Sequence, residues 1–281
     1  MLFYFPVIAS FLNAVSTYFE KVLFRDKSVK PRNFIPATFF LAFCFTAIFA
    51  FPLFGKISPA ALSFKNIAIF IGMIILAITA NYLYYYGFCR EKLSEVEQWL
   101  SMSPLVTVIL SSIFFASERD PRILVAAILA GIALIFSHAE RHKIRIHRGS
   151  WALFGCIMIG GFEALLIKEL LLLYSPVALY TIRIGMVAFF TMFLFGPPFK
   201  QLGKKNTKMI ALVSLLWMVI MILTYTSYKN AGLVFTTLVL MLSQVLIYLE
   251  SIFVFREKLK PRFVLAIFII LACVAYAEII R

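Results

Sequence analysis

Charged side chains are scarce in this chain. Only 14% of its 281 residues are Asp, Glu, Lys or Arg, whereas soluble domains contain about 25%. Hydrophobic residues make up 63%. The stretches between apolar runs do not exceed roughly 20 residues, which is too short for a hydrophobic core of their own. The composition therefore excludes a soluble domain and indicates that the whole chain lies in a membrane.

The chain is also poor in residues that bind metals or carry out redox chemistry. Its four cysteines stand singly in apolar segments, without the paired spacing of a zinc or redox motif, and they are interpreted as packing residues. The three histidines lie around one basic loop, without a set of carboxylates and cysteines at metal-ligand spacing, and the basic neighbours would repel a cation. Gly-rich phosphate loops, Gly-x-Ser-x-Gly elbows and His-Glu-x-x-His helices are missing. The sequence therefore predicts neither a metal site, nor a cofactor, nor an enzyme.

Acidic residues are outnumbered, with 13 Asp and Glu against 27 Lys and Arg. The net charge of +14 would suggest nucleic acid as the partner of a soluble protein. Here the basic residues occupy short loops between apolar runs, where Lys and Arg ordinarily mark the cytoplasmic face of a membrane protein. Membrane topology thus explains the charge, and nucleic acid is not an expected partner.

Apolar runs long enough to cross about 30 Å of hydrocarbon predict ten transmembrane helices. The first run begins at Leu2 without a charged leader or cleavage site, so it is interpreted as a retained helix. The expected spans are 2–22, 34–54, 66–88, 95–115, 122–138, 150–171, 175–196, 208–228, 233–255 and 262–279.

With ten spans both termini lie on one face of the membrane. The loops on the opposite face carry 19 Lys and Arg residues, against seven on the face of the termini. The positive-inside rule therefore predicts a multi-pass protein of the cell (plasma or inner) membrane with both termini outside.

The chain contains an internal repeat. A shift of 139 residues aligns Tyr86 with Tyr225 and superimposes two copies of Ser-Ile-Phe-x-x-x-Glu, at 112–118 and 251–257. The repeat predicts two units, 1–140 and 148–281, within a single compact membrane domain. Each unit holds five spans, an odd number, so the second enters the membrane with the opposite orientation. Inverted repeats of this kind are typical of secondary transporters, which bind substrate near the midplane between the two halves.

The same residues resemble a known family. The run from Tyr84 to Phe136, with Arg90, Pro104 and Glu118, is similar to the EamA-type module of the drug/metabolite transporter superfamily. The second half is similar as well, on the residues Lys168, Ser175, Pro176, Arg183, Lys229, Glu257 and Tyr276. The resemblance implies an all-α membrane fold of ten helices in two inverted five-helix repeats. It also implies export or exchange of small metabolites or amino-acid-like compounds.

Three charged residues lie far from any loop: Glu163, Arg183 and Glu250. A charge at the centre of an inserted helix costs roughly 2.5–3.5 kcal/mol, so these side chains are expected to face the bundle interior. Glu163 and Glu250 are candidate proton carriers. The alternative for Glu163 is a structural ion pair with Arg183.

Polar residues recur on single helix faces. Ser94, Glu97, Gln98 and Ser101 have the spacing of one face in the fourth span, and Thr237, Gln244 and Ser251 recur in the ninth. Such stripes line a water-accessible cavity or hydrogen-bond neighbouring helices as packing contacts. Tyrosines near the ends of the third and eighth spans form either an interfacial belt or a surface for an organic substrate. The substrate-binding candidates are Asn13, Thr17, Asn81, Tyr85, Gln98, Ser101, Glu163, Arg183, Tyr225, Thr237 and Gln244.

These features favour a secondary transporter that works as a monomer in the lipid bilayer and moves a small organic solute by alternating access. One alternative is a membrane scaffold or sensor that transports nothing, in which the polar stripes pack dry. Another is an intramembrane enzyme acting on lipid, which needs a catalytic pair at one membrane depth.

Overall fold

The protein is a bundle of helices. The computed structural model describes residues 4–25, 29–88, 90–91, 96, 99–138, 148–196, 202–253 and 261–280. About 90% of these residues are helical, and none of them belongs to a strand. Eight of the described helices are long and apolar enough to cross a membrane.

The helices follow one another with short connections. The first half contains α1 (Tyr4–Arg25), α2 (Pro31–Phe45), η1 (Thr46–Ala50), α3 (Phe51–Phe54), η2 (Pro59–Leu62), α4 (Phe64–Phe88), α6 (Ser103–Phe114), η3 (Ala116–Glu118) and α7 (Pro121–His138). The second half contains α8 (Arg148–Leu170), α9 (Pro176–Phe195), α10 (Lys204–Ala231), α11 (Leu233–Leu240), α12 (Leu242–Phe253) and α13 (Pro261–Ile280).

Proline marks where several helices begin. Pro121, Pro176 and Pro261 open α7, α9 and α13, and Pro104 follows the first residue of α6. Proline suits this first turn because its missing N–H would have no partner there and its φ angle is already helical. Ser175 adds a side-chain cap to α9, since its hydroxyl oxygen accepts a hydrogen bond from the N–H of Ala178 at 3.2 Å.

Large apolar side chains cover the outside of the bundle. Phe64, Phe193 and Ile279 keep 90%, 80% and 84% of their surface exposed, which would be unfavourable in water but suits hydrocarbon. Small hydroxyl residues such as Ser10, Ser214 and Ser227 are instead fully buried. Each donates its hydroxyl to the carbonyl oxygen four residues earlier in its own helix. These bonds satisfy polar groups that have no access to water inside a bilayer.

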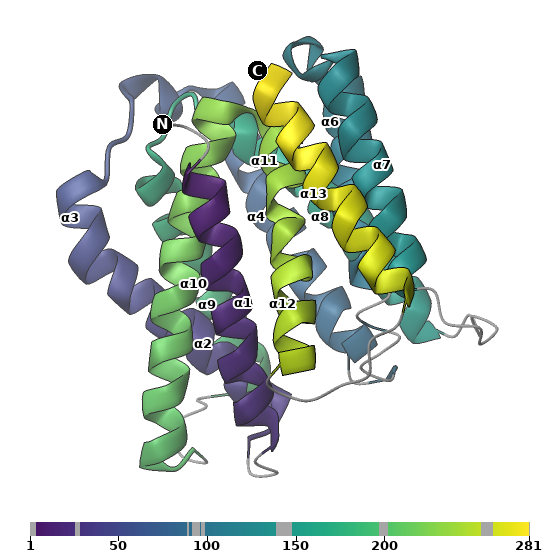
Figure 1. Ribbon diagram of the computed structural model, residues 1–281. Helices are drawn as coiled ribbons and strands as arrows, with labels where there is room; N and C mark the ends of the chain where they lie inside the picture. The colour runs from purple at the N-terminus through teal and green to yellow at the C-terminus, as the bar shows by residue number, and fades with distance from the viewer. Residues whose placement is uncertain are drawn as a thin grey trace.

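Helices of the two halves interleave. Helix α4 packs along α8, α1 along α10, and α7 along α13 (Figure 1). Further contacts join α2 to α9, α1 to α12, and α6 to α8. The two halves therefore share one interface through the bundle.

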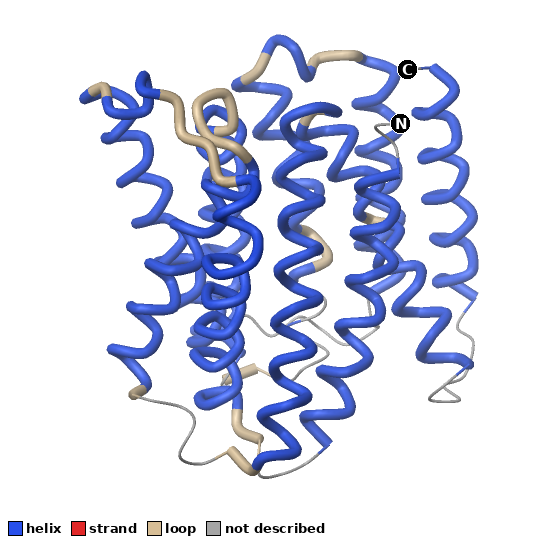
Figure 2. The backbone as a smooth tube through the Cα atoms, turned by 90° about the vertical axis from the view of Figure 1, so that its left-hand side faces the viewer, coloured by secondary structure: helices blue, strands red, loops and turns tan. Residues whose placement is uncertain are grey.

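The first described helix begins where the last described helix ends. Helix α1 begins and α13 ends at the same end of the bundle (Figure 2), here called the termini end. The connections η3 (between α6 and α7), 171–175 (between α8 and α9) and Gly232 (between α10 and α11) lie at this end too, because consecutive helices alternate in direction.

The expected spans are met in part. Eight of them coincide with the long apolar helices, whereas the fourth and fifth correspond to the shorter α6 and α7. The 12 residues of α6 extend only about 18 Å at 1.5 Å per residue, and residues 92–95 and 97–98, where the fourth span was expected to start, lie outside the described residues. The ninth span is divided into α11 and α12 by a turn at Met241.

Candidate functional site: a polar face inside the bundle

Helix α8 presents two different faces. Trp151, Phe154 and Phe162 keep 64%, 38% and 38% of their surface exposed and form its outward face. Cys156, Gly160 and Glu163 lie on the opposite face, at the spacing of four and three residues that aligns side chains along a helix. A Cβ atom added at Gly160 would meet nothing within 4 Å among the described residues. Open space therefore borders α8 on the face that looks into the bundle.

An ion pair lies one turn from this space. Nε of Arg183, on α9, donates to Oε1 of Glu163 at 2.5 Å. The side chains remain 11% and 7% exposed. Because a buried charge is costly unless it is paired, the contact explains how both residues are accommodated inside the bundle. The structural ion pair considered from the sequence is therefore present.

Tyrosines surround this pair. The rings of Tyr180 and Tyr225 meet edge to face with centroids 6.0 Å apart, and Tyr228 stacks on Tyr225 at 6.3 Å. Tyr225 is 2% exposed, and its hydroxyl has no hydrogen-bond partner among the described residues. A buried hydroxyl without a partner is unusual, so this group is free to bind a ligand or a water molecule. Thr237 of α11 lies beside Tyr228.

A second polar group lies two turns further along α8. Nε1 of Trp217, on α10, donates to Oε1 of Glu20 on α1 at 2.7 Å, and the Ser16 hydroxyl donates to the same oxygen at 3.3 Å. Tyr85 of α4 is an electrostatic neighbour of both Glu20 and Cys156. The polar face of α8 thus runs from the Glu20 group through Gly160 to the Glu163–Arg183 pair.

The structure brings together only part of the predicted site. Glu163, Arg183, Tyr225 and Thr237 form one group around the ion pair, and Tyr85 belongs to the Glu20 group. Gln98 lies outside the described residues.

The other predicted residues differ in their surroundings. The Thr17 hydroxyl donates to the Asn13 carbonyl at 2.9 Å, and Asn81 Nδ2 donates to the Ala77 carbonyl at 2.7 Å, so Thr17 and Asn81 bond to their own helices. Ser101 is buried and Gln244 is half-buried. Glu250 is separate from Glu163, because it neighbours Lys21 of α1, and its Oε2 has no partner among the described residues.

Sequence reasoning gave no binding role to three members of the polar face. Cys156 was interpreted as a packing residue, and Gly160 and Glu20 are not among the substrate-binding candidates. The signal that singled out Glu163, an acid within an apolar span, also applies to Glu20. Gly160 carries no such signal, because the space beside it depends on which helices lie opposite.

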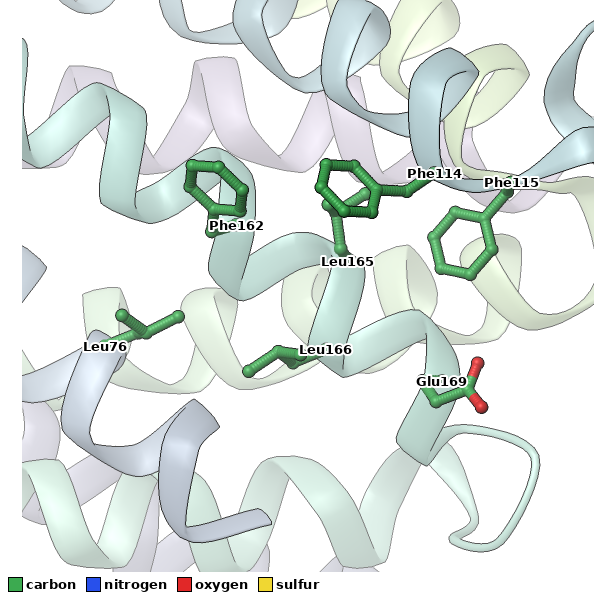
Figure 3. A pocket seen from close by; sticks show the side chains of 7 residues that line it. All are labelled: Leu76, Phe114, Phe115, Phe162, Leu165, Leu166 and Glu169. Carbon is green, nitrogen blue, oxygen red and sulfur yellow. The ribbon is translucent and has the colours of Figure 1, made fainter. Parts of the chain in front are cut away.

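A separate apolar pocket opens on the side of the bundle. It has a volume of about 470 Å³ and lies between α4, α6 and α8 (Figure 3). Phe114, Phe115 and Phe162 line it together with three leucines, and Glu169 is its one charged residue. None of the predicted site residues faces this pocket, which therefore differs from the polar chamber expected between the halves.

Metal-binding groups are not found in the part of the chain that the structure describes: no three His, Cys, Asp or Glu side chains come together there in a way that could hold an ion. The groups on the polar face that can bind a ligand are the ion pair, hydroxyl groups, tyrosine rings and the Cys156 thiol.

Comparison with known proteins defines the fold alone. No family model and no curated protein matches the sequence. Twenty-eight chains of solved structures match it in fold. One of them, named only "Crystal structure of protein", has a TM-score of 0.76 and 12% identity, with 98% of this chain and 96% of that chain covered. The chain therefore has the fold of that protein over nearly its whole length.

Proposed function

We propose that the protein is a secondary transporter that moves a small organic solute across the membrane by alternating access. The observation that carries this proposal is the interior face of α8, where open space beside Gly160 adjoins the Glu163–Arg183 pair and the unpartnered Tyr225 hydroxyl. A polar, partly empty region inside an apolar bundle is the kind of place where a transporter binds its substrate.

The pairing of the helices supports an inverted repeat. In a ten-helix interpretation of two five-helix halves, α1 corresponds to α8, α2 to α9, α4 to α10, α6 to α11 and α12 together, and α7 to α13. Exchange of the halves converts the α4–α8 contact into the α10–α1 contact. It likewise converts α1–α12 into α8–α6 and leaves α2–α9 and α7–α13 unchanged. A pseudo-twofold relation of this kind suits alternating access, and with the sequence motifs it favours the drug/metabolite transporter superfamily.

The site has groups for several parts of an organic substrate. The Arg183 guanidinium has more donors than its bond to Glu163 uses, the Tyr225 hydroxyl is available, and the tyrosine rings can stack on apolar or cationic groups. Glu250 is the better of the two proton-carrier candidates. Its Oε2 has no hydrogen-bond partner among the described residues and can therefore take up a proton, whereas Glu163 is held by Arg183.

Transport can be tested without knowing the substrate. The purified protein is reconstituted into liposomes, a pool of small metabolites is added outside, and the contents are identified by mass spectrometry. We expect at least one solute to enter faster than into liposomes without protein. Gly160→Phe should block this entry by filling the open space, while Gly160→Ala should preserve it, because a Cβ meets nothing there.

Equal entry of every solute with the wild type, with Gly160→Phe and with empty liposomes would reject transport and leave a scaffold or sensor as the function. Folding of each variant is checked by its elution as a single species in detergent.

A further inference from the structure

The carboxylate of Glu118 lies at a junction of the two halves. Glu118 ends η3, the short connection between α6 and α7 of the first half. Its Oε1 accepts the N–H of Leu233 at 2.9 Å, and its Oε2 accepts the N–H of Val234 at 3.0 Å. Lys168, near the end of α8, forms an ion pair with Oε1. One carboxylate thereby holds two helices of the second half.

The positive end of α11 explains why a carboxylate lies here. The first N–H groups of a helix have no partner within it, and the helix dipole places a partial positive charge at this end. Gly232 precedes α11 with φ +89°, and a Cβ atom at this position would lie 2.8 Å from Oε1 of Glu118. Only glycine combines this backbone conformation with such a close approach. Gly232 therefore leaves room for the Glu118 carboxylate at the start of α11.

Lys168 is fixed on a second side. Its Nζ lies 4.5 Å from the centroid of the Phe115 ring, in the segment that joins α6 to η3. Below the contact, Leu110, Leu165 and Leu233 pack together with Tyr228, a member of the tyrosine group around Arg183. The Glu118 contacts thus lie next to an apolar cluster that includes one member of the tyrosine group around Arg183.

We propose that Glu118, Lys168 and the N–H groups of Leu233 and Val234 form a latch that keeps the termini end of the transport pathway closed, and that this latch opens and closes in each cycle. The inference rests on the proposed function, because a pathway must be open to each face in turn. The contacts suit a reversible latch, since they join opposite halves through a single side chain on a short connection. They consist of polar contacts, which water can replace when the end opens.

The test uses the native thiol of Cys156 as a reporter of access from each face. Cys44, Cys89 and Cys273 are replaced by Ala, and the protein is placed in sealed vesicles. Protease cleavage of a C-terminal tag identifies which face is outside. A charged, membrane-impermeant thiol reagent is then added to the termini face, and the labelling rate of Cys156 is measured by mass spectrometry.

We expect Glu118→Ala and Lys168→Met to raise the labelling rate from the termini face by about tenfold or more, the size of effect typical for the loss of a charge-assisted hydrogen bond. Glu118→Gln should raise it less than Glu118→Ala, because an amide oxygen still accepts from α11. Glu169→Gln is the matched control. It removes the neighbouring acid on α8, for which no ion pair is found among the described residues, and should leave the rate unchanged.

The outcomes separate the latch from the proposed function. Unchanged labelling in both Glu118→Ala and Lys168→Met, or an equal rise in Glu169→Gln, would overturn the latch. Fast labelling of the wild type from the termini face would overturn it as well. Solute entry into liposomes with no latch effect would leave transport standing, whereas a latch effect without solute entry would count against transport alone. Loss of stability by itself cannot imitate the result, because an unfolded protein would be labelled from both faces.

Discussion

Two neighbouring glycines of α8 have opposite surroundings. Gly160 borders open space, whereas a Cβ atom at Gly161 would lie 2.8 Å from Cδ1 of Leu110 and 3.1 Å from Cγ1 of Val106 on α6. A glycine therefore borders open space at one position and allows close helix packing at the next.

Alanine substitutions should separate these two roles. We expect Gly161→Ala to destabilise the protein by about 1–3 kcal/mol, because the added methyl group overpacks the contact between α8 and α6. Gly160→Ala should leave stability unchanged or raise it slightly, since alanine is the better helix former. Thermal unfolding of both variants in the same detergent provides the measurement. A larger loss at Gly160 would contradict the open space assigned beside it.

The Glu163–Arg183 pair predicts a non-additive effect. Arg183→Met or Glu163→Gln alone should each cost about 3–5 kcal/mol, because one charge is left buried without its partner. The double variant should be more stable than the less stable single variant, since no uncompensated charge remains. A double-mutant cycle on the unfolding free energy measures this coupling. Simple addition of the two losses would show that the side chains do not depend on each other.

At the scale of elements, hydropathy predicted the long helices well. The length of an apolar run and its charge content can be taken from the local sequence, so eight of the expected spans coincide with helices of the structure. The break between α11 and α12 was missed because no proline or glycine marks it: the N–H of Met241 bonds to the carbonyls of both Thr237 and Leu238, at 3.2 Å each. A turn of this kind is set by the surrounding helices, which a single sequence does not display.

The start of α11 gives a prediction with a matched control. Gly232 and Gly196 both have a positive φ, +89° and +78°. Alanine should cost about 1–3 kcal/mol at either position through backbone strain, because ψ is 163° at Gly232 and 175° at Gly196 and this region is essentially restricted to glycine. At Gly232 the added methyl group also collides with the Glu118 carboxylate, whereas at Gly196 it would meet none of the described residues within 4 Å. We therefore expect the larger loss of thermal stability in Gly232→Ala. Equal losses would argue against a close contact between Gly232 and the Glu118 carboxylate.

At the scale of the whole molecule, the sequence predicted that polar residues gather inside the bundle and offered the Glu163–Arg183 pair as one alternative, but it did not predict the other contacts among them. Glu163 and Arg183 were recognisable because charge is rare in apolar spans. Their association with Tyr225, and the separation of Glu250 from them, depend on helix packing across the chain. The contact of Glu118 with α11 joins residues 115 positions apart, and the motif around Glu118 indicated a repeat without revealing this partner.

Proton coupling of the proposed transport would be a property of the whole molecule. Once a transported solute is known, its uptake by the wild type should depend on pH. Glu250→Gln should remove that dependence, because an amide cannot carry the proton. Glu250→Asp should retain it. Uptake into liposomes over a range of external pH values tests this, and a full pH response in Glu250→Gln would exclude the residue as the carrier.

The orientation of the bundle gives a further prediction. Described basic residues such as Lys30, Arg90 and Lys204 lie at the end opposite the termini. By the positive-inside rule that end faces the cytoplasm, so a C-terminal reporter that is active only in the cytoplasm should stay silent. An active reporter would reverse the orientation without changing the fold.

The neutrality of the Glu163–Arg183 pair has an electrical consequence. An unpaired ion that crosses the membrane field gains or loses about 2.3 kcal/mol for every 100 mV, which would make reorientation of an empty transporter depend on voltage. A pair of opposite charges held together carries no net charge through the field. In the transport cycle proposed above, movement of this pair should therefore add nothing to the voltage dependence of the return step, and any such dependence would come from other charges, such as Glu250, from the solute or from a coupling ion.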